Sequence, residues 1–140
     1  MINSFSGQHA FLSNFYKVDI TYEGLTYPSV EHAYMAQKTL NMLERQLFTD
    51  PGMAAGQAKK LGRTLQLRPD WESVKVIIMA NLLAIKFTHK ELRDKLLATG
   101  DEMLVEGNWW NDTFWGVCKG VGLNQLGLLL MELRTAIRNG

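Results

Sequence analysis

The chain has 140 residues, of which 46% are hydrophobic and 21% are charged, and its formal net charge is +1. This length predicts one domain that buries roughly two-thirds of its unfolded surface. The near-neutral charge gives no overall electrostatic reason to bind nucleic acid or an anionic membrane. A single cysteine excludes an internal disulfide, and the first ten residues lack the basic start and apolar run of a signal peptide. We therefore expect a soluble, cytoplasmic protein.

The first predicted element is a hairpin over residues 17–27. Its β-forming side chains lie on either side of Glu23-Gly24, which is a turn signal. Pro28-Ser29 then opens a helix, with Ser29 as its cap, and we expect this helix to run to about Glu44.

Helices dominate the rest of the chain. A second helix is predicted to begin after Asp50, with Pro51 at its first position, and to stop near Gly62. The later predictions are a third, mostly apolar helix from Pro69-Asp70 to about Phe87, a fourth from the capping box Thr88–Glu91 to Gly100, a short strand over Met103–Glu106, and a last helix from the cap Asn124 to about Arg138. The expected fold class is α+β, mainly α-helical, in a single compact domain spanning residues 1–140.

The stretch 107–123 holds three of the four tryptophans, three glycines and Asp112, and it has neither helical nor strand periodicity. Connections of this length are usually functional or disordered. Disordered segments lack Trp, Phe and Val, so a functional loop is favoured. An aromatic, glycine-rich loop with a carboxylate suits a flat ring or a sugar. The alternative is that the tryptophans simply fill the core.

The first helix is the second informative element. Glu31, Tyr34, Met35 and Lys38 are spaced i, i+3, i+4 and i+7, so they share one face. The opposite side is also largely apolar, which predicts an embedded helix. Glu31 and Lys38 would then lie roughly 10 Å apart along the axis, partly buried and with perturbed protonation, as in many catalytic sites. The alternative is a pair of snorkelling side chains or structural ion pairs.

Other sequence patterns argue against metal and nucleotide cofactors. The histidines at positions 9, 32 and 89 have no metal-ligand spacing, and the lone Cys118 offers no cluster. There is no P-loop, and the glycines at 116, 120 and 122 do not form a Rossmann fingerprint. We expect no metal and no cofactor.

Several segments match, in the correct order, the motifs of one family. They are Leu12–Tyr16, Tyr27–Tyr34 with Gln37-Lys38, Leu96–Asp101, Val105–Asn108, Asp112 with Trp115-Gly116, and Gly122–Gly127 followed by Leu130–Arg134. In these segments, which cover nearly the whole chain, the protein resembles the NADAR superfamily. That family is associated with NAD and ADP-ribose metabolism and includes riboflavin-intermediate N-glycosidases.

The resemblance implies hydrolysis of an N-glycosidic bond between ribose C1 and a nitrogen heterocycle or amine. Two substrate classes are implied: phosphoribosylamino-pyrimidine intermediates of riboflavin synthesis, and ADP-ribosyl-guanine in nucleic acid. No membrane and no obligate protein partner is expected.

The resemblance also implies roles for individual residues. Breaking the bond develops positive charge on the ribose, which a carboxylate stabilises, or the carboxylate activates water. A desolvated Lys38 either attacks C1 of an opened sugar or acts as a positive charge. The predicted catalytic residues are Lys38, Asp112, Glu31 and Glu106, and the predicted substrate-binding residues are Ser13, Asn14, Phe15, Tyr16, Tyr34, Asn108, Trp109 and Trp115.

Two rival functions compete with hydrolysis. One is a non-catalytic module that binds ADP-ribose or NAD, and the other is an interaction protein that uses Trp109 and Trp110 as anchors. A binding module needs donors and stacking surfaces, and three carboxylates beside an anionic ligand would oppose it. Those carboxylates together with Lys38 favour an enzyme.

Overall fold

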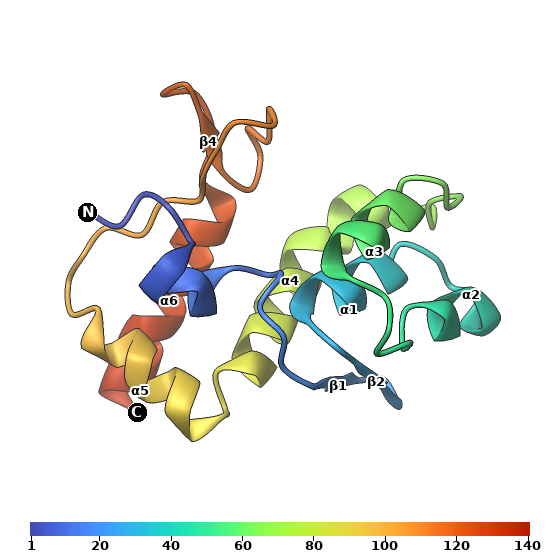
Figure 1. Cartoon of the computed structure of the whole chain (residues 1–140), viewed down its shortest axis with the longest axis horizontal. Helices are drawn as coiled ribbons and strands as arrows, with labels where there is room; N and C mark the ends of the chain where they lie inside the picture. Colours follow the sequence, from blue (N-terminus) through green and yellow to red (C-terminus); the bar gives the residue numbers. More distant parts are fainter. The chain divides into compact units, whose positions relative to one another are not determined.

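The computed structural model describes residues 1–140, and the chain divides into two compact units. Unit 1 consists of residues 1–13 and 87–140, and unit 2 consists of residues 14–86. The predicted α+β class with helices dominating is confirmed, because the only sheets are two pairs of very short strands (Figure 1). None of the helices combines the length and apolar character that crossing a membrane requires.

Unit 2 opens with the predicted hairpin, which is confirmed. Strands β1 (Ile20–Tyr22) and β2 (Leu25–Tyr27) pair antiparallel, with Ile20 opposite Tyr27. Glu23 and Gly24 both have positive φ, 48° and 86°. Two consecutive positive φ values are what a two-residue hairpin turn requires to match the twist of its strands.

The prediction of one helix from Pro28-Ser29 to Glu44 is wrong. The structure has two helices instead, α1 (Val30–Ala36) and α2 (Met42–Leu47). Asn41 separates them, because its Oδ1 accepts hydrogen bonds from the backbone N–H groups of Leu43 (2.9 Å) and Glu44 (3.2 Å). An asparagine side chain that bonds the backbone in this way starts a new helix rather than continuing the old one.

The next helix, α3 (Ala55–Gly62), begins four residues later than predicted. Pro51 lies in a turn, in which Asp50 Oδ1 accepts a hydrogen bond from Gly52 N (2.8 Å). Helix α4 (Trp71–Lys86) agrees closely with its prediction.

Helix α1 is the centre of unit 2. All seven of its residues are buried, and it contacts α2, α3, α4 and the hairpin (Figure 1, cyan). Its approach to α3 depends on Gly62, where an added Cβ would lie only 2.2 Å from Met35 Sδ. The expectation of an embedded first helix is therefore confirmed.

Unit 1 contains the 3₁₀ helix η1 (Gly7–Leu12) and the helices α5 (Lys90–Ala98) and α6 (Gln125–Asn139), of which α5 and α6 contact each other. Gly100, with φ +62°, ends the α5 region as predicted. Helix α5 begins one residue later than the predicted cap at Thr88 implies. The residue at the cap is His89, and its side chain makes no capping hydrogen bond.

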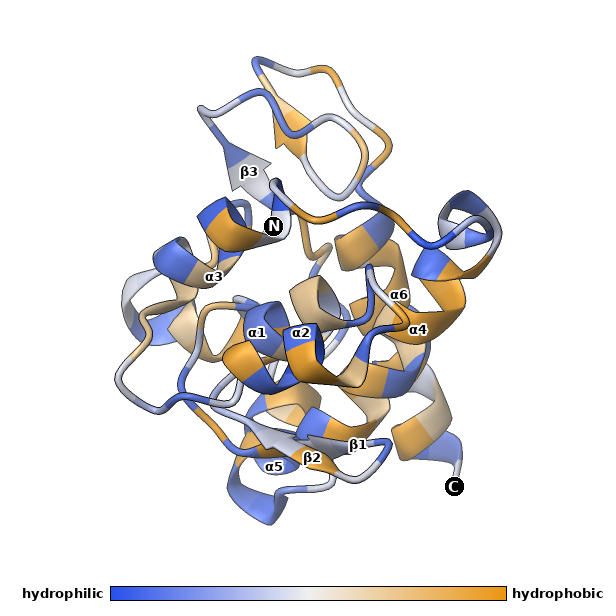
Figure 2. Ribbon diagram, turned by 90° about the vertical axis from the view of Figure 1, so that its right-hand side faces the viewer, coloured by the Kyte–Doolittle hydropathy of each residue, from blue (hydrophilic) through white to orange (hydrophobic).

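The strand predicted over Met103–Glu106 is also wrong. Only Leu104 forms a bridge there, parallel to Ile2. The regular strands lie inside the tryptophan-rich stretch, where β3 (Gly107–Asn108) pairs parallel with β4 (Val117–Cys118). Figure 2 shows β3 in pale and hydrophilic colours and its neighbouring strand in the hydrophobic colour. A strand of two residues is too short to produce a periodicity that sequence analysis detects.

Candidate functional site

Glu31 lies in the first turn of α1, and Lys38 follows the end of that helix. Glu31 is 7% exposed, and its backbone N donates to Asn14 O (3.0 Å). Lys38 lies two residues beyond the helix, in a turn in which its N donates to Met35 O (3.2 Å). The turn keeps Lys38 within the electrostatic reach of Glu31, although the helix itself ends earlier than predicted.

The pKa of Lys38 is lowered from its ordinary value. Burial is the main cause, because it disfavours the charged ammonium, and the nearby cations Arg63, Lys59 and Lys75 lower the pKa further. Glu31 acts in the opposite direction. This side chain therefore releases its proton more readily than a lysine in water, which is the property that a nucleophilic amine needs.

Two other α1 residues are engaged in packing. Tyr34 is 4% exposed, and its ring packs against Trp71 of α4 with ring centroids 5.1 Å apart. His32 is fixed from both sides, because Nδ1 lies 2.7 Å from Ser29 Oγ and Nε2 lies 2.7 Å from Met53 O. A carbonyl can only accept, so Nε2 carries the hydrogen. Burial lowers the pKa of His32, which favours this neutral form.

The segment Asn14–Tyr16 precedes the hairpin. Asn14 Nδ2 contacts Met79 Sδ at 3.6 Å, while its Oδ1 is buried without any hydrogen-bond partner. A buried acceptor in this state costs free energy. An incoming hydroxyl donor would relieve that cost.

Phe15 lines a pocket of about 270 Å³ in unit 2. The pocket is lined by Phe15, Lys17, Pro28, Ser29, His32 and the segment 51–55. Phe15 offers an exposed ring, and Lys17 is also exposed. The pocket therefore combines an apolar surface with a cation, which suits a flat ring carrying an anionic group.

In unit 1, Asn108 and Asp112 hold the tryptophan-rich loop in shape. Asn108 accepts from Asp112 N (3.0 Å) and donates to Asp112 O (2.8 Å). Asp112 Oδ1 in turn accepts from the backbone N–H groups of Phe114 (3.2 Å) and Trp115 (2.9 Å). One carboxylate oxygen of Asp112 is thus committed to the backbone, and Oδ2 is left for other chemistry.

Glu106 is held by its backbone against α6 and β4. Its N donates to Asn124 Oδ1 (3.0 Å), and its O accepts from Val117 N (2.8 Å). Gly116 lies directly against this carbonyl, because an added Cβ would be 2.2 Å from Glu106 O. Asn124 precedes α6 as predicted, but it does not cap that helix with its side chain, which bonds Glu106 and Leu104 instead.

The tryptophans of the loop fall into two groups. Trp109 is 83% exposed and meets Trp110 edge-to-face, with centroids 5.6 Å apart. Trp115 is half-buried and meets Phe114 in the same geometry at 4.9 Å. Trp109 and Trp110 are therefore not core residues, whereas Trp115 is partly sheltered.

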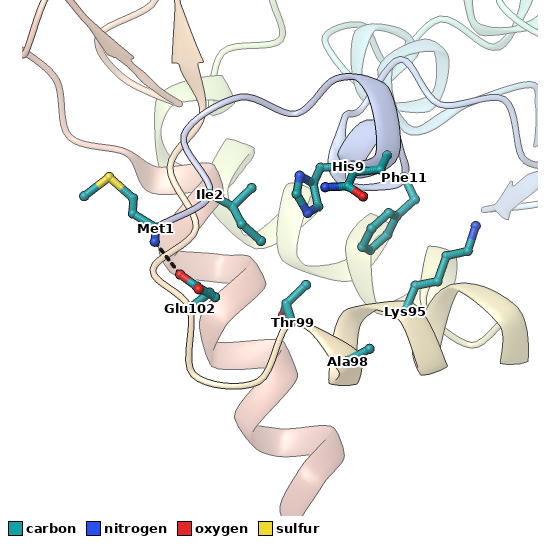
Figure 3. A pocket seen from close by; sticks show the side chains of 9 residues that line it. Met1, Ile2, His9, Phe11, Lys95, Ala98, Thr99 and Glu102 are labelled. Atoms are coloured by element: carbon teal, nitrogen blue, oxygen red, sulfur yellow. Dashed lines mark hydrogen bonds and ion pairs between the residues drawn. The ribbon is translucent and has the colours of Figure 1, made fainter.

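A second pocket, of about 500 Å³, lies in unit 1 (Figure 3). It lies between η1, which carries His9 and Phe11, and the end of α5, which carries Lys95 and Thr99. Glu102 on its rim pairs with the amine of Met1. None of the predicted site residues lines this pocket.

The structure gathers the predicted residues into two sets. Unit 2 holds Asn14, Phe15, Tyr16, Glu31, Tyr34 and Lys38, and unit 1 holds Ser13, Glu106, Asn108, Trp109, Asp112 and Trp115. Ser13 itself ends η1. The sequence analysis did not single out the buried charges Arg45, Lys86 and Arg134, of which Lys86, at the end of α4, is 0% exposed. No local signal marks Lys86, because a lysine near the end of an apolar helix usually reaches solvent.

Comparison with known proteins decides the family. The NADAR domain model matches residues 3–138. The chain belongs to the NADAR family. NADAR relatives include the N-glycosidase Npun_R5314 of Nostoc punctiforme, which is 43% identical over 91% of this chain and 85% of that protein. The N-glycosidase YbiA of Escherichia coli is 42% identical over 94% of this chain and 83% of that protein.

The NMR structure of E. coli YbiA has the same fold. Its TM-score is 0.85 at 37% identity, covering 99% of this chain and 88% of that chain. A riboflavin biosynthesis protein of Vibrio vulnificus, VVA0006, is 39% identical over 93% of this chain, which corresponds to 36% of the longer protein. With relatives of this identity over most of its length, the chain is an N-glycosidase.

Proposed function

We propose that this N-glycosidase hydrolyses the bond between ribose C1 and a nitrogen heterocycle or amine, and that Lys38 carries the reaction. The observation that supports this is the half-buried side chain of Lys38, whose pKa is lowered, in the turn that follows α1 and within electrostatic reach of the buried Glu31. An uncharged amine is a nucleophile, whereas an ordinary surface lysine is protonated at neutral pH.

The proposed reaction has two steps. The neutral Nζ of Lys38 adds to C1 of the open-chain sugar, where the departing nitrogen is present as an imine. The nitrogen base leaves as an amine and takes up a proton, which gives an imine between Lys38 and the sugar. Water then hydrolyses this imine, releasing the sugar aldehyde and regenerating the amine. Glu31, Glu106 and Asp112 are the candidates for moving protons and stabilising the positive charge.

The substrate-binding roles follow from the chemistry of the side chains. Asn14 Oδ1, buried without a partner, is suited to accept a hydrogen bond from a sugar hydroxyl. Phe15, Tyr16 and Trp115 supply ring surfaces, and Ser13 and Asn108 supply hydrogen bonds, whereas Tyr34, buried against Trp71, has little ring surface to offer. The family model spans residues of both units, which supports a single NADAR domain over residues 1–140. The one free cysteine is compatible with the reducing cytoplasm.

A phosphoribosylamino-pyrimidine is the substrate that we favour. The support is the Vibrio relative VVA0006, which is named a riboflavin biosynthesis protein. ADP-ribosyl-guanine in nucleic acid is the second candidate, and a separate observation favours it. Trp109, 83% exposed beside Trp110, offers the kind of aromatic surface on which unpaired bases stack.

The test is to incubate the protein with both substrate classes and to measure the released base and sugar by mass spectrometry. Borohydride added during turnover should trap the sugar covalently on Lys38. Lys38→Ala should lose roughly 10²-fold or more in rate, while the exposed control Lys60→Ala should behave as wild type. A folded Lys38→Ala with wild-type turnover contradicts the role of Lys38. The second candidate would be favoured if the enzyme turned over only an oligonucleotide that carries ADP-ribosyl-guanine, and if Trp109→Ala lost that turnover.

A further inference from the structure

Lys86 is a buried charge that the proposed reaction does not use. It is the last residue of α4 and is 0% exposed. Together with Met79, Leu82 and Leu83 it forms the buried stripe of that helix. Withdrawing an ammonium from water is costly, and a leucine or methionine would fill the same space without that cost. A lysine at this position therefore calls for an explanation beyond packing.

The segment that contains Asn14 and Tyr16 contacts this stripe at two points. Asn14 Nδ2 lies 3.6 Å from Met79 Sδ, and the Lys86 ammonium lies 5.5 Å from the centre of the Tyr16 ring. Met79 and Lys86 are seven residues apart, so the two contacts are spaced roughly 10 Å along the helix. The first contact is a weak hydrogen bond to sulfur, and the second is a cation over an aromatic face.

The side chains that follow Asn14 lie near the surface, although the Asn14 carbonyl accepts a hydrogen bond from Glu31 N. Phe15 is 46% exposed, Lys17 is exposed and Tyr16 is only partly buried. An apolar residue at position 86 would attract the Tyr16 ring without fixing its orientation. An ammonium attracts the face of the ring in preference to its edge, because the face carries the negative part of the quadrupole. The charge of Lys86 thus favours an arrangement in which the face of the Tyr16 ring is turned toward the ammonium.

We propose that Lys86 is a positioning residue of the substrate site, and that its buried ammonium holds the Tyr16 ring where the ribosylated substrate binds. The inference rests on the proposed function, since it assigns Tyr16 to that site. Lys86 acts through Tyr16, and its loss should weaken substrate binding more than it slows the chemical step.

A double-mutant cycle tests this assignment. Lys86→Met removes the charge and keeps an unbranched apolar side chain, and Tyr16→Leu removes the ring. Each single variant should raise KM about 10-fold with kcat within about 3-fold, since misplacing a binding group by about 1 Å has effects of up to 10²-fold. The double variant should be no worse than either single variant. Lys86→Arg, which keeps a cation, should recover most of the affinity, and Lys90→Met serves as the surface control, since Lys90 is 80% exposed.

Two outcomes overturn the assignment: KM effects that multiply to about 100-fold in the double variant, or a wild-type KM in Lys86→Met. If Lys86→Met does not fold, NMR of ¹³Cε-labelled lysine in the wild type answers the same question. The Lys86 signal should show an upfield ring-current shift that Tyr16→Leu abolishes. If the Lys86 signal shows no ring-current shift although the enzyme has normal turnover, the role of Lys86 is overturned and the proposed function is not. Absence of wild-type turnover on every N-ribosylated substrate overturns the proposed function and the substrate role together.

Discussion

At the scale of single residues, the protonation of Lys38 is set by identifiable neighbours. Burial and the cations Arg63, Lys59 and Lys75 lower its pKa, and Glu31 raises it. The amine therefore loses its proton at a lower pH than a lysine in water. If neutral Lys38 is the nucleophile, the rate rises with pH through this lowered pKa. If its positive charge is what matters, the rate falls over the same range.

Removing one of these cations should move the pH profile in a known direction. Arg63→Gln takes away a positive charge that lowers the pKa of Lys38, and the pKa of Lys38 should therefore rise. In a plot of log kcat against pH, the part of the curve that reports the titration of Lys38 should move to higher pH. Arg63 is exposed, so the displacement should shrink in high salt, where the screening length falls to about 3 Å at 1 M.

Lys60→Gln is the matched control for this experiment. Lys60 is an exposed neighbour on α3 and is not among the charges that act on Lys38. Its profile should coincide with that of the wild type. A profile of Arg63→Gln that also coincides would mean that the titrating group is not Lys38.

At the scale of elements, the β3–β4 loop depends on close contact between backbones. Gly116→Ala would place a Cβ 2.2 Å from the backbone atom Glu106 O, so one of the two backbone segments would have to shift. We expect a loss of about 1–3 kcal/mol in the free energy of unfolding, as for other overpacked sites. Activity should fall as well, because Glu106 would be displaced. Urea denaturation and turnover measure the two effects.

Gly56→Ala is the opposite case. It lies in α3, and an added Cβ there meets nothing within 4 Å. Alanine at a helical position should stabilise the protein by roughly 0.5–1 kcal/mol. If Gly116→Ala and Gly56→Ala changed the free energy of unfolding equally, the close contact between residue 116 and Glu106 O would not be what makes the loop sensitive to substitution.

The sequence predicted some of these elements better than others, for physical reasons. The hairpin and α4 carry strong local signals, namely a turn dipeptide and a long apolar run. The break between α1 and α2 depends on which groups the Asn41 side chain bonds, and sequence periodicity does not reveal such a choice. Strands β3 and β4 have only two residues each, which is too short for the alternating pattern by which a strand is recognised in a sequence.

The candidate site shows the same division. Helical spacing and an apolar surround singled out Glu31 and Lys38 as a partly buried pair, but Lys38 lies in a turn after α1, so its position depends on that turn and not on helical spacing. Lys86 was not predictable, because a lysine near the end of an apolar helix usually reaches solvent, and only tertiary packing buries it. The tight commitment of Asp112 Oδ1 to the backbone likewise depends on the folded loop.

At the scale of the whole molecule, we expect hydrolysis to need no metal ion. No group of three or more His, Cys, Asp or Glu side chains is arranged to hold a metal, and in the reaction proposed above Lys38 attacks the imine carbon of the opened sugar without the help of a metal. Turnover after prolonged treatment with EDTA should remain within about 2-fold of the untreated enzyme, since losing a metal that stabilises the transition state costs several kcal/mol. Activity lost on chelation and restored by one added cation would contradict this mechanism.

The division of the chain into residues 14–86 and the two flanking segments has a consequence for synthesis on the ribosome. Every residue of unit 2 has been made before residue 87 is added, so unit 2 can fold while the chain is still growing. Residues 1–13 emerge first, yet the pairing of Ile2 with Leu104 requires a partner made about a hundred residues later. Ile2 therefore waits for Leu104, and unit 1 is completed after unit 2.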